Sequence, residues 1–129
     1  MIAARSPASG TRVIWQADDN TTGNRITVYT SGTTVMVDVV TGGVVQASLN
    51  LGVVAAGAAF KVALRYKANS FAASLNGAAV VTDISGTVPV VNRCRLGADI
   101  AGNHLCGTLS AFNGYAFAPS DSQLQAFAA

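Results

Sequence analysis

Short turn signals recur along this sequence, and their spacing limits what the chain can fold into more than any other feature does. Ser-Gly, Gly-Gly and Asn-Gly pairs separate runs rich in Val and Thr, whereas helix-forming residues other than Ala are scarce. Val and Thr favour strands, and Asn-Gly or Gly-Gly pairs accept the backbone angles of tight hairpin turns. The sequence therefore predicts many short strands joined by hairpins.

The strand positions follow from the alternation of apolar and polar residues. Phe60–Tyr66 is the clearest case, because every second side chain is apolar and basic residues fall on the opposite face. Further strands are expected at 11–17, 25–30, 33–41, 44–51, 71–75, 78–82, 93–98 and 107–117. Ser120 and Gln123 then have the spacing of a helix cap. About nine strands and one terminal helical turn predict an all-β fold, an antiparallel β-sandwich of jelly-roll type, as one domain over residues 1–129.

Composition excludes several classes of function. Charged residues make up 11 % of the chain, and the net charge of +2 comes from scattered Lys and Arg, so nucleic-acid binding is not expected. The longest apolar stretch, Val53–Phe60, is far shorter than the roughly 20 residues of a membrane-spanning helix. The sequence contains no Glu, which excludes glycosidase sites built on a Glu pair and His-Glu-x-x-His zinc proteases. It also lacks a Gly-x-Ser-x-Gly elbow, and we expect neither an enzyme nor a cofactor.

Two small polar clusters have both a functional and an ordinary interpretation. Cys106, His104 and Asp99 lie within eight residues and could act as nucleophile, base and orienting carboxylate, although no family signature surrounds them. A lone loop histidine is usually just solvated. Asp18 and Asp19 could offer oxygens to calcium, but such residues also form turns, and no third carboxylate follows nearby. We prefer the solvated histidine and the turn.

The second half of the chain contains segments typical of one family. They are FKVALRYKAN at 60–69, ASLNG at 73–77, RLG at 95–97 and LSAFNGYAFAP at 109–119, the last followed by SDSQLQA. These segments resemble the concanavalin A-like, laminin-G-like jelly-roll domains of bacteriophage virion proteins. The resemblance reaches back to Asp18 and implies a concanavalin A-like sandwich with a structural role in a virion.

The sequence departs from that family at two places. Phe112 and Tyr115 stand where the last strand usually carries basic residues, and only 10 residues precede the strand expected at Thr11–Ala17, where the family usually has further strands. A sheet without its opening strands exposes unpaired backbone groups along an edge. We therefore expect the Thr11–Ala17 strand, through Arg12 and Ile14, or whichever strand the missing opening segment would have covered, to pair with another chain. That chain is either a second copy or an arm of the major capsid protein.

Cys94 and Cys106 fall on neighbouring expected strands. The resemblance allows a disulfide, because some laminin-G domains carry one late in the fold, whereas a protein that folds in a reducing cytoplasm keeps free thiols. Neither cysteine has the spacing of a zinc finger. We prefer two half-buried thiols that are close in space but not needed for folding.

Five basic residues could share one sheet face. Lys61, Arg65 and Lys67 project to one side of their strand, and Arg93 and Arg95 project to one side of another. Such a patch could meet an acidic partner or an anionic glycan, or it could simply be solvated.

These observations favour a non-enzymatic virion structural protein that decorates or cements the capsid surface and is assembled in the host cytoplasm. Its expected partners are the major capsid protein and copies of itself, with a homodimer as the simplest case, and neither nucleic acid nor a membrane. The alternative is a receptor- or glycan-binding domain of a phage tail fibre, in which Trp15, Tyr29 or Tyr115 stacks on a sugar. The absence of heptads and of a Gly-x-y tract, which would form a trimeric stalk, favours decoration.

Overall fold

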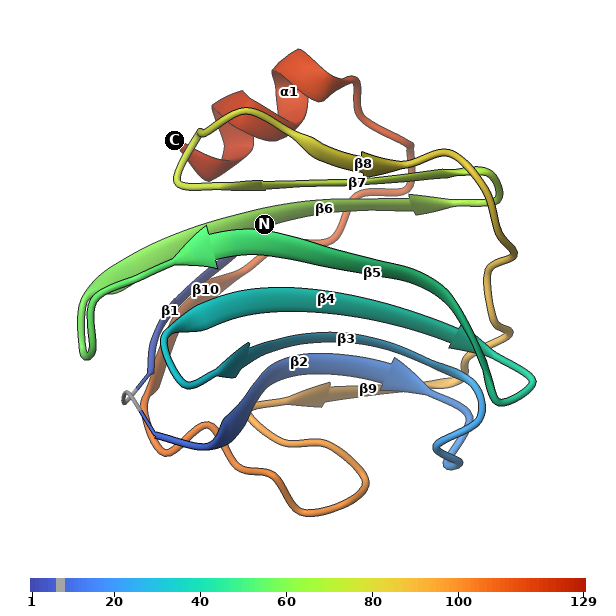
Figure 1. Ribbon diagram of the computed structural model, residues 1–129, viewed down its shortest axis with the longest axis horizontal. Coiled ribbons are helices and arrows are strands. Elements are labelled where there is room, and N and C mark those ends of the chain that lie inside the picture. The colour runs from blue at the N-terminus through green and yellow to red at the C-terminus, as the bar shows by residue number, and fades with distance from the viewer. Residues whose placement is uncertain (7–8) are drawn as a thin grey trace.

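The computed structural model describes residues 1–6 and 9–129, whose strands form two antiparallel five-stranded sheets packed as a sandwich (Figure 1). Sheet A has the order β10-β1-β6-β7-β8, and sheet B has the order β5-β4-β3-β2-β9. The strands are β1 Ile2–Arg5, β2 Thr11–Asp18, β3 Arg25–Ser31, β4 Thr34–Thr41, β5 Val44–Val53, β6 Ala59–Lys67, β7 Ser70–Leu75, β8 Val81–Asp83, β9 Arg93–Leu96 and β10 Thr108–Phe112, and helix α1 spans Asp121–Ala128. The predicted antiparallel sandwich with a short C-terminal helix is therefore confirmed.

The two sheets bury a common apolar core between them. In β4, Val35, Val37 and Val39 are at most 1 % exposed, as the alternation predicts. Phe60 of β6 and Phe71 of β7 belong to the same cluster. Each large apolar side chain contributes roughly 1.5–3 kcal/mol when it is fully buried. The core therefore fixes which faces of the strands point inward.

Helix α1 lies on the outer face of sheet A (Figure 1). Leu124 packs against Ala63 of β6 and Ala72 of β7, whose small side chains let the helix approach the sheet closely. The predicted cap at Ser120 is confirmed, because its side chain accepts from the N–H of Gln123 at 3.3 Å while the Gln123 side chain accepts from the Ser120 N–H at 2.8 Å. In the described part of the chain, no helix is long and apolar enough to cross a membrane.

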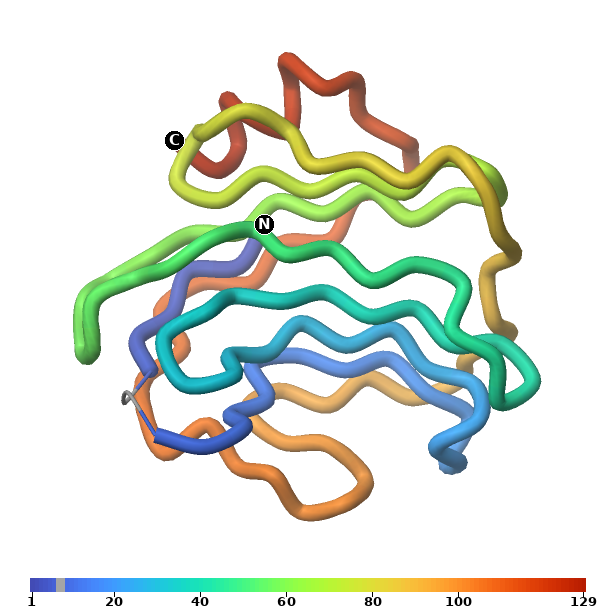
Figure 2. Tube along the Cα trace, in the orientation of Figure 1, coloured from blue at the N-terminus to red at the C-terminus, as the bar shows by residue number. Residues whose placement is uncertain are grey.

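The first strand lies where the sequence predicts none. β1 runs between β10 and β6, so segments from both ends of the sequence lie side by side, blue against orange in Figure 2. Ile2 of β1 is opposite Val62 of β6 and Phe112 of β10. The IAAR segment escapes pattern analysis because it is four residues long and holds one β-branched residue. β10 is shorter than the expected 107–117, because the residues after Phe112 leave the sheet to reach α1.

The strand that was expected to form an open edge lies inside its sheet. β2 pairs with β3 on one side and, at residues 15–18, with β9 on the other, and the Gly97 N–H donates to the Ile14 carbonyl. The edge prediction is therefore wrong for 14–17, whereas no described strand covers that side of 11–13. Ile14 is 0 % exposed and belongs to the core, which removes it from any partner surface. Arg12 donates to the carbonyl of Ser9 at 2.9 Å and to the sulfur of Cys106 at 3.2 Å. The N-terminal residues do supply an opening strand, but they supply it to sheet A.

Candidate binding cleft

One stretch of sheet A has a partner strand on one side only. β1 covers residues 59–62 of β6 and begins at Ile2, opposite Val62. β7 covers the other side of β6 as far as Lys67. Within residues 1–6 and 9–129, no strand pairs with the β1 side of residues 63–67. We call this uncovered stretch the gap: it is an open end of β6, because β1 and β10 stop level with Val62, at Ile2 and Phe112.

Leu64 and Tyr66 direct their peptide groups into this gap. The N–H of Asn76 donates to the Lys61 carbonyl at 2.9 Å, and the Lys61 N–H donates to Oδ1 of Asn76 at 2.8 Å, so the peptide groups of Lys61 face the β7 side. The hydrogen-bonding groups of successive residues in a strand point to opposite sides. Those of Arg65 therefore face β7, whereas those of Leu64 and Tyr66 face the gap.

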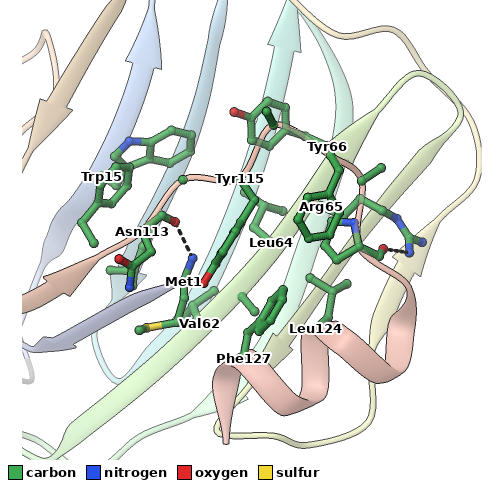
Figure 3. Close-up of a pocket in the computed structure, with 18 of the residues that line it drawn as sticks. Met1, Trp15, Val62, Leu64, Arg65, Tyr66, Asn113, Tyr115, Leu124 and Phe127 are labelled. Atoms are coloured by element: carbon green, nitrogen blue, oxygen red, sulfur yellow. Dashed lines mark hydrogen bonds between the residues drawn. The ribbon is translucent and has the colours of Figure 1, made fainter.

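The gap opens into a cleft of about 320 Å³ (Figure 3). Residues 62–67 of β6 and the N-terminal Met1 and Ile2 line one part of it, and segment 112–119 with the inner face of α1 lines another. Trp15 of sheet B closes it on the side of the core. Residues 112–118 are all exposed, so this segment is not buried in the core. The volume falls at the lower end of the range of roughly 300–1,000 Å³ that is usual for ligand sites.

Aromatic rings surround the cleft. The Trp15 ring centroid lies 6.1 Å from that of Tyr66 and 6.0 Å from that of Phe112. On the helix side, Tyr115 stacks on Phe127 with 4.8 Å between centroids and 11° between ring planes. Trp15 is only 6 % exposed, but Tyr66, Phe112 and Tyr115 are between 38 and 46 % exposed. The cleft therefore presents apolar surface that a partner could bury.

The polar groups of the cleft are basic or neutral. Arg65 donates from Nη1 to the carbonyl of Pro119 and to Oδ1 of Asp121, both at 2.8 Å, which ties β6 to the start of α1. The buried Nε of Arg65 has no hydrogen-bond partner among the described residues. The α-amino group of Met1 donates to the carbonyl of Asn113 at 2.9 Å, and burial lowers its pKa. The lining residues include no Asp, so the cleft suits an apolar ligand that carries hydrogen-bond acceptors.

The structure separates the five basic residues that the sequence places on one face. Lys61, Arg65 and Lys67 lie in β6 of sheet A, whereas Arg93 and Arg95 lie in β9 of sheet B, so the shared patch is wrong. Alternation assigns residues to a side of their own strand, but it does not say which sheet holds the strand. Arg65 and Lys67 are the members of this group that line the cleft.

Arg95 is paired with a buried carboxylate. Its Nε donates to Oδ2 of Asp18 at 2.7 Å, Gln16 donates to the same oxygen at 2.9 Å, and the Asn20 N–H donates to Oδ1 at 2.8 Å. Burial alone would raise the pKa of Asp18, but the hydrogen bonds outweigh burial and hold the pKa below its usual value. Asp19 accepts hydrogen bonds within its own loop, as the turn interpretation predicts. Among the described residues, no group of three or more His, Cys, Asp or Glu could hold a metal ion.

The nucleophile arrangement considered around Cys106 is not formed. Asp99 accepts from the N–H and the side-chain amide of Asn103, both at 2.8 Å, rather than orienting His104. His104 is exposed, and the sulfur of Cys106 accepts from Arg12. The bonds between Asp99 and Asn103 close a turn within the 97–107 loop.

Two of the three aromatic residues considered for sugar stacking line the cleft, namely Trp15 and Tyr115. Tyr29 does not line it and donates its hydroxyl to Oδ2 of Asp38 at 2.9 Å. Burial and the neighbouring Asp38 raise the pKa of Tyr29 to about 12. Tyr29 therefore links β3 to β4.

Both cysteines are free, in agreement with the thiol interpretation, but they are exposed rather than half-buried. Cys94→Ser and Cys106→Ser should each change the free energy of unfolding by no more than about 0.5 kcal/mol, because substitutions at exposed positions have small effects. Urea unfolding with and without a reductant measures this. A variant that loses stability only under oxidising conditions would point to a disulfide.

Comparisons of the chain with models of protein families, with curated proteins and with solved structures found no match. Sequence reasoning missed the contributions of Tyr66 and Phe112 to the cleft and the gap beside them. The signal in the sequence was the close spacing of the aromatic residues Phe112, Tyr115 and Phe117 ahead of the helix cap.

Proposed function

We propose that this chain is a non-enzymatic structural protein of a bacteriophage virion that binds a neighbouring protein on the capsid surface, as a decoration or cement protein. The observation that carries this mode of action is the gap in sheet A, where exposed aromatic rings surround the unpaired peptide groups of Leu64 and Tyr66. Another chain gains main-chain hydrogen bonds and buries apolar surface at such a place. The virion setting is inferred from the resemblance of the chain to phage jelly-roll domains.

Exposed apolar side chains outside the cleft support the same proposal. Val44, Val45 and Ile84 are between 59 and 81 % exposed. The N–H of Thr87 donates to the side chain of Gln46 at 3.0 Å, which holds the segment after Ile84 against the start of β5. Apolar surface of this kind, on a chain with few charges, is suited to burial in an assembly. The proposed partners are the major capsid protein and further copies of the chain.

A receptor- or glycan-binding domain of a tail fibre is the second candidate, and the aromatic lining of the cleft favours it. However, Trp15 is nearly buried and packs against Tyr66 and Phe112, which leaves its ring faces little room for a sugar. The uncovered peptide groups beside these rings are better matched by another polypeptide. We therefore place the protein ligand first.

Binding of the purified chain to empty capsids of the phage that encodes it tests the proposal. We expect saturable binding, and antibody labelling of the chain on purified particles. Tyr66→Ala should weaken capsid binding about tenfold or more, because central aromatic residues dominate most interfaces. Val53→Ala, which removes an exposed apolar side chain from sheet B, is the control and should leave binding unchanged. Binding to host glycans without binding to capsids would overturn the proposal in favour of the second candidate.

A further inference from the structure

We propose that the cleft takes an extended segment of a partner protein, in which apolar residues alternate with acidic ones, as an added strand antiparallel to β6. This inference rests on the proposed function and names the form and the chemistry of the partner's contact. Four observations carry it: the direction of the peptide groups, the register set by β1, the two faces of β6, and the charge of the lining.

The register follows from β1. Ile2 lies opposite Val62, so a strand that continues the line of β1 past its first residue places successive residues opposite Leu64, Arg65, Tyr66 and Lys67. Because Leu64 and Tyr66 point their N–H and C=O groups into the gap, the residues opposite them exchange backbone hydrogen bonds with β6. The added strand would thereby complete sheet A along the whole length of β6.

The inner face of this strand must be apolar. Residues opposite one another in an antiparallel pair share a face of the sheet, and Ile2 and Val62, 4 % and 1 % exposed, both face the core. Leu64 and Tyr66 continue that face. The partner residues opposite them would meet Trp15, which lines the cleft from sheet B. Valine-like side chains at these two positions cover surface that is now open.

The outer face of this strand favours acidic residues. The positions opposite Arg65 and Lys67 share the outer face with those side chains. The buried Nε of Arg65 lacks a partner, and a carboxylate opposite it supplies an acceptor. Asp121 already accepts from Nη1 of Arg65, so the partner carboxylate would bond to the Arg65 Nε, and Lys67 supplies the charge that attracts it. A basic residue at either position would be repelled.

A second copy of this chain fits the cleft less well than a different protein does. Segment 84–92 is the extended stretch that exposes Ile84 and Val90, but it contains no acidic residue and includes Pro89, which has no N–H to donate. Asp99 in the 97–107 loop is engaged by Asn103. The alternating pattern therefore has to come from a partner.

Amide hydrogen exchange of the free chain tests the gap before any ligand is added. The N–H groups of Leu64 and Tyr66 should exchange at least about tenfold faster than that of Arg65, which is bonded to β7. Equal protection of all three amides at low protein concentration would show that the gap is closed and would overturn the inference. Protection of Leu64 and Tyr66 that arises only with self-association would assign the cleft to a second copy and would also overturn it.

The peptide acetyl-Asp-Val-Asp-Val-amide is the probe for the partner segment, followed by NMR titration of the backbone amides. We expect saturable shifts and added protection at Leu64 and Tyr66. Methylation of the two valine nitrogens, which removes the donors facing β6 and keeps every side chain, should weaken binding about tenfold or more. Acetyl-Lys-Val-Lys-Val-amide should bind more weakly than the acidic peptide. Equal binding of the methylated and unmethylated peptides, or no binding of the acidic one, would overturn the inference.

Two charge-reversal variants test whether the acidic peptide is attracted by the charge of Lys67 in the cleft or by the net charge of the protein. Lys67→Glu should weaken binding of the acidic peptide several-fold and strengthen binding of the lysine peptide, whereas Arg93→Glu makes the same charge change in sheet B and should alter neither. If the chain binds capsids but the peptides do not bind the cleft, the inference fails while the proposed function stands. If the chain does not bind capsids, the proposed function is wrong, whether or not the peptides bind the cleft.

Discussion

Replacing Gly107 with alanine should destabilise the fold by about 3 kcal/mol, because a Cβ at this position would overlap the backbone carbonyl oxygen of Arg5. The neighbouring residue Thr108 pairs with Arg5 where β10 meets β1, so neither backbone can move without breaking that ladder. The backbone angles of Gly107 are not in the left-handed region, and space alone makes the glycine necessary. Urea unfolding of the two proteins gives the difference in free energy.

Gly114→Ala is the matched control. Gly114 also has no left-handed angle, and a Cβ there meets no atom within 4 Å. Alanine at this position should be neutral or should stabilise the chain by up to about 1 kcal/mol, because it restricts the unfolded state. Equal losses in the two variants would show that the β1–β10 contact is not the cause. Since Met1 and Ile2 also line the cleft, the proposed function predicts that Gly107→Ala reduces capsid binding as well.

Replacing Asp18 with alanine should cost about 2–4 kcal/mol of stability. The change removes the acceptor for Arg95, for the buried side chain of Gln16 and for the N–H of Asn20. Gln16 is 1 % exposed, so its amide cannot turn to water for a replacement bond. Asp83→Ala, which removes a carboxylate bonded in an exposed turn, should cost less than about 1 kcal/mol and serves as the control.

The same carboxylate makes the stability of the protein depend on pH. The pKa of Asp18 is lower in the folded chain than its usual value of 3.8, so its stabilisation is fully present above that value and is lost as the pH falls through the folded pKa. The difference in unfolding free energy between the wild type and Asp18→Ala should therefore shrink as the pH is lowered from neutral to about 3 and below. A difference that is independent of pH would contradict this assignment.

The strands that sequence analysis located well are those whose pattern is local. The alternation in Phe60–Tyr66 and in β4, and the Gly42-Gly43 turn between β4 and β5, are signals that lie within a few residues. The strand expected at 78–82 is displaced, because β8 begins only at Val81 and Asn76-Gly77 does not form a two-residue hairpin. β1 could not be found this way. It is stable only because its backbone pairs with residues 59–62 and 108–112, which are far away in the sequence.

The cleft could not be predicted from local sequence patterns either, because it is formed by residues that are far apart in the sequence. Trp15, Tyr66 and Phe112 come from three strands in two sheets, and their approach depends on how the sheets pack. The gap beside them depends on where β1 begins relative to β6, which is a matter of register. Lys61 and Arg95 show the converse limit: alternation assigns each residue to one side of its own strand, but the two strands belong to different sheets.

The central place of β1 in sheet A also orders the steps of folding. The meander β2-β3-β4-β5 of sheet B consists of consecutive hairpins, which need only short loops to close and can form early. β1 has to wait for β6 and, on its other side, for residues 108–112. Until those residues have left the ribosome, the nascent chain exposes the inner face of a finished sheet B. We expect the protein to be most prone to aggregation during that interval.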